Sequence, residues 1–197
     1  MRYGVLCFIG GASLGLLGIQ EVLLKAKSAN TPTGITLKEL IEKGPGPNKF
    51  IVLKDFIYCD NILFKPLSAN STSKEAWESA WTPIIPNQPD QAPDRKPVRF
   101  QAILKWPDVR SETHYKQLSR ETTLKGMVIN DMVSLSFNQR KQLQEAYPDT
   151  DFNKCWIIEV GRAPGGFFKL ILLFTGAGLL FLGGAAGIIV ALKQKKE

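Results

Sequence analysis

The chain has 197 residues, of which 25 are Lys or Arg and 18 are Asp or Glu, giving a formal net charge of +7. Within residues 25–166 the basic and acidic side chains are interspersed, 20 against 16, and they form no basic stripe. We therefore expect no nucleic-acid partner. The three cysteines lack a CxxC spacing, which argues against zinc, covalent haem and dithiol redox chemistry.

The chain begins with a long apolar segment. No charge occurs from Tyr3 to Gln20, a run of 18 residues. A hydrocarbon core about 30 Å thick takes roughly 20 helical residues, so residues 1–24 are predicted to be an N-terminal transmembrane helix. A cleaved signal peptide is the alternative, because small residues follow at Ala26–Ala29. The apolar run is longer than the usual signal-peptide core of about 7–15 residues, which favours an uncleaved anchor.

Residues 25–166 are predicted to form one soluble α+β domain with a modest core. Capping boxes, alternating hydrophobicity and turn residues predict its elements. In chain order they are a helix at 37–43, a β-hairpin of strands 50–58 and 62–67, a helix that starts at Thr72, a proline-rich loop at 82–97, a strand at 98–105, a helix at 109–119, a strand at 124–129, a helix from Ser136 to Ala146 and a strand at 155–160. The strands pair non-locally, which favours a small β-rich domain or a partly closed barrel.

One stretch of this domain is expected to meet a partner. A capping box of Thr72 and Glu75 predicts a helix that carries two tryptophans one turn apart. The prolines of the following loop predict an extended, irregular chain. The residues expected to contact a partner are Trp77, Trp81, Pro83, Pro86 and Pro89.

A second long apolar segment follows the domain. From Leu170 to Leu192 there are 23 residues without a charge, so residues 167–192 are predicted to be a C-terminal transmembrane helix. The basic tail at 193–197 carries three lysines. Two spans put both termini on one side, and the positive-inside bias favours the inner side. Residues 25–166 would then be extracytoplasmic, in a periplasm or an equivalent organelle space.

Both apolar segments carry glycines in matching positions. Gly4, Gly11 and Gly15 are spaced by 7 and 4, and Gly176, Gly183 and Gly187 repeat these intervals, while Gly18 extends the first face. Each trio lies on one side of a helix, and each contains a GxxxG pair that lets membrane helices approach closely. We expect a helix-packing face, within the chain or against another subunit. The alternative is that glycine is simply common in membrane helices.

The cysteines leave a disulfide open. Cys59 and Cys155 lie in predicted strands of one domain, whereas Cys7 lies within the first apolar segment. In an oxidising compartment the first two would form a bond. The alternative is that both are small buried apolar residues, since their neighbours are core-like.

No catalytic motif appears in the sequence. The one histidine, His114, stands outside any nucleophile motif and is interpreted as a surface residue. We predict no catalytic residue, no cofactor-binding residue and no metal ligand, and hence no enzyme.

The layout of span, β-rich domain and span is similar to that of the Surf-family oxidase assembly factors. This resemblance in layout implies an accessory or assembly role. We therefore expect a non-enzymatic, two-span structural or accessory subunit, or an assembly factor, of a larger membrane protein complex, with other subunits and the lipid bilayer as partners. A membrane-tethered sensor or enzyme with an unrecognised site on the soluble domain is the alternative.

Overall fold

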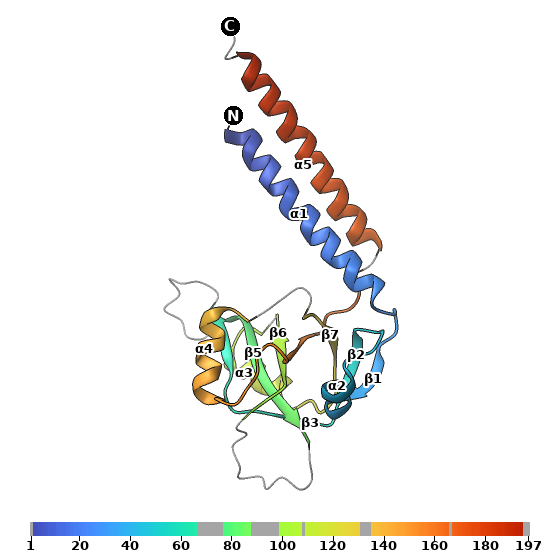
Figure 1. The fold of residues 1–197 in the computed structure, drawn as a ribbon, viewed down its shortest axis with the longest axis vertical. Helices are drawn as coiled ribbons and strands as arrows, with labels where there is room; N and C mark the ends of the chain where they lie inside the picture. Colours follow the sequence, from blue (N-terminus) through green and yellow to red (C-terminus); the bar gives the residue numbers. More distant parts are fainter. Residues whose placement is uncertain are drawn as a thin grey trace. The chain divides into compact units, whose positions relative to one another are not determined.

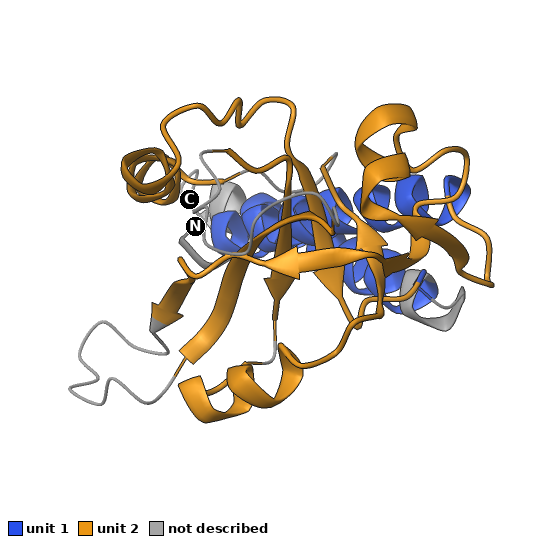
Figure 2. Ribbon diagram, turned by 90° about the horizontal axis from the view of Figure 1, so that it is seen from below, with its two compact units in different colours: residues 1–27, 164–197 blue, residues 28–163 orange. Residues whose placement is uncertain are grey.

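The computed structural model describes residues 2–66, 77–87, 99–107, 109–130, 135–165 and 167–194. The chain divides into two compact units, residues 1–27 with 164–197, and residues 28–163 (Figure 2). In the part of the chain that the structure describes, the first unit holds two long helices, and the second holds strands and three short helices (Figure 1). The predicted α+β class is confirmed.

The first unit is an antiparallel helix pair, α1 (Arg2–Ala26) and α5 (Phe167–Gln194). Within the described residues, Gly4–Ala26 and Ile171–Ile189 are long and apolar enough to cross a membrane, with mean hydropathy of 1.7 and 2.0. The N- and C-termini lie at the same end of the pair (Figure 1). Large apolar side chains are exposed along both helices, as a lipid-facing surface requires. They include Leu6, Ile9, Leu16, Leu172, Leu179 and Leu182.

The second unit is built on one eight-stranded, nearly closed, barrel-like sheet (Figure 1). Its strands are β1 (Thr33–Thr36), β2 (Phe50–Lys54), β3 (Phe56–Tyr58), β4 (Leu63–Pro66), β5 (Trp77–Pro86), β6 (Ala102–Trp106), β7 (Leu124–Val128) and β8 (Trp156–Val160). Their order in the sheet is β1-β2-β7-β8-β6-β5-β3, and β4 also pairs with β5. The pairs β1–β2 and β6–β8 are parallel, and the others are antiparallel.

One residue turns the chain from one end of the sheet to the other. β2 pairs with β1 and β7, whereas β3, which follows after one residue, pairs with β5. The joining residue is Asp55, whose φ is 55°. Asp is among the few non-glycine residues that adopt this left-handed conformation. The Asp55 carbonyl accepts a hydrogen bond from the backbone N–H of Asn87 at 3.0 Å, which ties the corner to the end of β5.

Three short helices accompany the sheet, α2 (Leu37–Lys43), α3 (Glu112–Leu118) and α4 (Phe137–Ala146). The capping boxes predicted for α2 and α4 are confirmed, because the Thr36 and Ser136 hydroxyls each accept from the backbone N–H three residues on. α2 places two leucines in the barrel core, and α3 adds a tyrosine that meets a tryptophan of β6 edge-on. The fully or nearly fully buried core residues include Leu37, Leu40, Ile51, Leu53, Leu104, Trp106, Tyr115 and Ile158.

The predicted hairpin of strands 50–58 and 62–67 is wrong. β3 and β4 do not pair with each other; they lie end to end and pair with successive stretches of β5, residues 84–86 and 77–81. At Asp60 and Asn61 the chain therefore continues along β5 and does not reverse its direction. Turn residues show where a strand stops, but the strand's partner is set by the rest of the sheet.

The predicted helix through Trp77 and Trp81 is also wrong, because both residues lie in the strand β5. Trp, Thr and Ile between 77 and 85 favour a strand that can bury its faces. The register shifts between Lys65 and Pro66, opposite Trp77. The Trp77 ring belongs to the core cluster and stacks on the ring of Phe64, which is half exposed. Residues 82–86 extend this strand in place of the predicted loop. The capping box of Thr72 and Glu75, and Pro89, lie outside the described residues.

Candidate functional site: glycine contacts between two apolar helices

Several glycines let the two apolar helices approach closely. A Cβ placed on Gly4 would lie 3.0 Å from the carbonyl oxygen of Gly184, and one placed on Gly11 would lie 3.1 Å from that of Ala177. A Cβ on Gly18 would lie 3.1 Å from the ring of Phe174. These distances are shorter than ordinary van der Waals contact, so the backbones meet only because no side chain separates them.

The three contacting glycines of α1 are seven residues apart. Gly4, Gly11 and Gly18 form a heptad row, and a seven-residue repeat keeps one helix face against its partner over several turns. Aromatic rings of α5 fill the row between the close backbone contacts. Phe181 lies beside Gly11 and meets Phe8 edge-on, with ring centroids 4.9 Å apart. The glycine row of α1 thus packs against the backbone of α5 and against phenylalanine rings of α5.

Not every predicted glycine takes part in this contact. Gly15 and Gly183 have open space within 4 Å of their Cβ positions. Gly176 and Gly187 make only ordinary contacts, at 3.8 and 3.7 Å. At most one glycine of each GxxxG pair therefore makes a close contact with the other helix.

Gly184 also belongs to the contact, although it was not among the predicted glycines. A Cβ on this residue would lie 2.9 Å from the carbonyl oxygen of Gly4 and 3.1 Å from the backbone nitrogen of Phe8. Gly184 follows Gly183 directly and is turned from it by about 100° around α5. The heptad row of α1 is the signal available in the sequence, but it does not reveal which face of α5 meets it.

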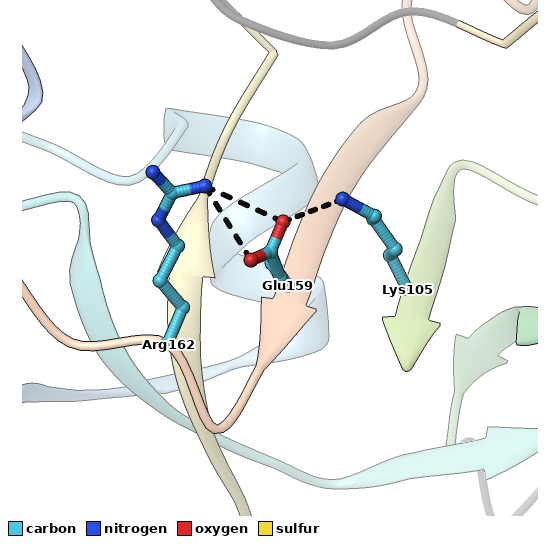
Figure 3. Close-up of polar contacts among 3 residues, drawn as sticks. All are labelled: Lys105, Glu159 and Arg162. Atoms are coloured by element: carbon cyan, nitrogen blue, oxygen red, sulfur yellow. Dashed lines mark hydrogen bonds and ion pairs between the residues drawn. The ribbon is translucent and has the colours of Figure 1, made fainter. Parts of the chain in front are cut away.

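The second unit contains a charged cluster on three neighbouring segments of the barrel. Glu159 of β8 lies between Lys105 of β6 and Arg162, which follows β8 (Figure 3). The ammonium of Lys105 is 2.7 Å from Glu159 Oε2, and Arg162 Nη1 is 3.4 Å from both carboxylate oxygens. The three side chains retain only 12–21% of their exposure. The carboxylate is thus engaged with two cations and ties β6 to the end of β8.

Cys59 and Cys155 are buried free thiols in the structure, and the disulfide was one of the two interpretations that the sequence left open. Cys155 Sγ donates to the backbone oxygens of Asp151 and Phe100, at 3.4 and 3.7 Å. Burial raises the pKa of Cys59 to about 11 and the pKa of Cys155 to about 12. Both thiols are therefore protonated near neutral pH and are poor nucleophiles and metal ligands.

The residues expected to contact a partner are largely inside the barrel. Trp77 and Trp81 each keep 6% exposure. Pro83 is buried in β5 and Pro86 is half-buried at its end. These side chains pack within the domain and do not form an exposed surface for a partner.

Two open grooves occur on the described part of the barrel unit. One, of about 570 Å³, runs between α4 and residues 150–153. The other, of about 320 Å³, is lined by Ile41, Asn130 and residues 153–156 among others. Among the described residues no three His, Cys, Asp or Glu side chains gather as a metal-ligand set.

The chain matches no family model, no curated protein and no solved structure. The resemblance in layout to the Surf-family assembly factors therefore stays a hypothesis. A function has to be argued from the chain's own helices, charges and grooves.

Proposed function

We propose that this chain is a non-enzymatic, two-span membrane protein that acts as an accessory subunit or assembly factor of a larger membrane protein complex. The observation that carries this proposal is the division of the glycines on the helix pair. One set, with Gly4, Gly11 and Gly184, holds α1 against α5. A second set, Gly15 and Gly183, has open space at its Cβ positions. Glycine adds no apolar contact with lipid, but it lets a further helix approach closely.

The ionisable groups of the barrel support a structural use over a catalytic one. The buried thiols have raised pKa values and stay protonated near neutral pH. The Glu159 carboxylate is committed to two cations. General acid–base or nucleophilic chemistry needs groups that exchange protons near the working pH. These residues are arranged for stability of the barrel.

We further propose that residues 25–166 are extracytoplasmic and that both termini are inside. The antiparallel arrangement of α1 and α5, with the two termini at one end of the pair, supports a common side for the termini. Lysines at 193, 195 and 196 favour the inner side for that end. In this arrangement the two helices anchor the chain in the membrane, and the extracytoplasmic domain contacts the partners.

Purification of the tagged full-length chain in gentle detergent, followed by mass spectrometry of stoichiometric partners, tests the proposal. We expect the wild type to co-purify with defined membrane subunits, and the double variant Gly15→Leu, Gly183→Leu to lose them. Ala185→Leu is the matched control, because Ala185 is exposed and lies about 200° around α5 from Gly183. A wild-type chain that elutes alone from its native membrane would contradict the proposed role.

A further inference from the structure

The groove beside α4 has walls that the fold holds in place. Thr150 Oγ1 accepts from the backbone N–H of Phe100 at 3.2 Å. The rings of Phe152 and Tyr147 both pack edge-on against Phe100, at centroid distances of 5.8 and 5.0 Å. The Gln144 side chain donates to the carbonyl of Pro148, which fastens the loop to the helix. A ligand would meet a preformed surface here, which lowers the entropic cost of binding.

The lip of the groove carries an aromatic ring that the fold does not use. Phe137, the first residue of α4, is 80% exposed, the largest exposed fraction among the large apolar side chains described. Among the residues of α4 only Leu143 is buried, so the helix packs through one side and presents the other to solvent. Aromatic side chains and arginine are both enriched at protein–protein interfaces.

The charges around this ring are unbalanced. Arg140 and Lys141 line the helix wall of the groove, and Asp151 lines the loop wall. The Asp151 carboxylate is already paired with Lys154 at 3.2 Å and accepts from the backbone N–H of Asn153. Lys141 forms no ion pair with any residue that the structure describes. The groove therefore offers positive charge to an occupant.

We propose that this groove docks an acidic segment of a partner protein, with one apolar side chain against Phe137 and carboxylates beside Arg140 and Lys141. The inference rests on the proposed accessory role, because the segment would belong to another subunit's soluble part. Charge complementarity identifies the occupant: an arginine and a lysine lie beside the ring, and Asp151, the only carboxylate among the described residues that line the groove, is already paired.

Fluorescence anisotropy with defined peptides tests this proposal. The full-length chain is held in nanodiscs of zwitterionic lipid, and three short labelled peptides are titrated. The first alternates Glu with Leu and contains one Phe, the second replaces each Glu by Lys, and the third replaces the apolar residues by Ser. We expect binding of the first peptide alone. Phe137→Ala and Lys141→Glu should each weaken it by roughly tenfold or more.

Two matched variants separate the groove from general effects. Lys38→Glu reverses an exposed charge on α2, and Ile57→Thr removes an exposed apolar side chain from β3; both should bind like the wild type. Thermal melting confirms that all variants fold, as expected for exposed positions. Equal binding by Phe137→Ala, or an equal loss in Lys38→Glu, would overturn the proposal.

Anionic vesicles form the last arm of the test. If the wild-type groove residues drive binding to these vesicles and the acidic peptide does not bind, the surface is a membrane contact and the proposal is wrong. Co-purification of subunits reports separately on the accessory role. A chain that keeps its partners but does not bind the acidic peptide would refute the groove alone, whereas a wild-type chain without partners would refute the role.

Discussion

Gly4 and Gly184 face each other across the helix pair, and a Cβ on either residue would lie too close to the carbonyl oxygen of the other. The two separations, from a Cβ built on one glycine to the oxygen of the other, are 3.0 and 2.9 Å. The contact is reciprocal, so a side chain on either residue pushes the same two backbones apart. Of the glycine positions described, it has the shortest such separations between α1 and α5, which belong to one compact unit.

Gly184→Leu should therefore loosen the helix pair, at a cost on the order of 1 kcal/mol or more. Gly11→Leu should act in the same direction, because its Cβ meets Ala177 and Phe181. Thermal unfolding of the full chain in mild detergent measures the effect. Gly183→Leu is the matched control, and it should leave this stability unchanged because its Cβ position is open. Similar losses in Gly183→Leu and Gly184→Leu would contradict the observed rotation of α5.

Asp55 should tolerate glycine but not a β-branched residue. Its φ of 55° costs a β-branched side chain about 1–2 kcal/mol, and glycine nothing. We expect Asp55→Val to lower the free energy of unfolding by about that amount and Asp55→Gly to keep it. Chemical denaturation of the full chain is the measurement. Lys54→Val, at the exposed neighbouring position in β2, should change stability by less than about 0.5 kcal/mol. Equal free energies of unfolding for Asp55→Val and Lys54→Val would argue against a left-handed backbone conformation at residue 55.

Glu159→Gln should destabilise the barrel more than the same change at an exposed pair. It would remove the counter-charge of the largely buried Lys105, at a cost of about 2 kcal/mol after allowance for partial exposure. The Lys65–Glu78 pair provides the control, since its side chains are 61% and 48% exposed. Glu78→Gln should cost less than about 1 kcal/mol. Equal costs in the two variants would show that the cluster is solvated like a surface pair.

The buried thiols predict a loss of stability at high pH. Burial raises the pKa of Cys155 from about 9 to about 12 and that of Cys59 to about 11. Above pH 9 the unfolded chain loses these protons while the folded chain keeps them, so folding weakens as pH rises. Replacing both cysteines by alanine should flatten this decline. It should not abolish it, because burial also raises the pKa of Tyr147 to about 12.

The same thiols should be protected from alkylation in the folded chain near neutral pH. Both should react fully after unfolding in the absence of reductant, because they are free in the structure. Mass spectrometry of the alkylated chain gives the count. A requirement for reductant would restore the disulfide that an oxidising compartment favours.

Local signals in the sequence predicted the parts of this fold that local interactions determine. The capping boxes of Thr36 and Ser136 give the starts of α2 and α4, and the two apolar segments give α1 and α5. The pairing of the strands was missed, because partners such as β1 and β2 are set by the whole sheet. The turn at Asp55 has no distinctive sequence pattern, since its role depends on β5 lying next to β3.

The candidate site was also predicted only in part. The spacing along the first apolar segment placed Gly4, Gly11, Gly15 and Gly18 on one helix face. In the structure Gly4, Gly11 and Gly18 lie close to α5, whereas Gly15 does not. The partner residue Gly184 was missed, because the rotation of α5 about its own axis depends on how two surfaces fit. Trp77 and Trp81 were expected to meet a partner but are core residues, and exposed Phe137 was overlooked because burial is a property of the fold.

The placement of the two helices across a membrane is tested most directly by paired cysteine labelling. In a cysteine-free chain, Lys38→Cys marks an exposed position of the barrel unit and a cysteine added after Glu197 marks the tail. A membrane-impermeant maleimide applied to intact cells should label position 38 and reach the tail only after lysis, with the chain resisting alkaline carbonate extraction. Equal labelling of both positions before lysis, or release of the chain by carbonate, would contradict the two-span account.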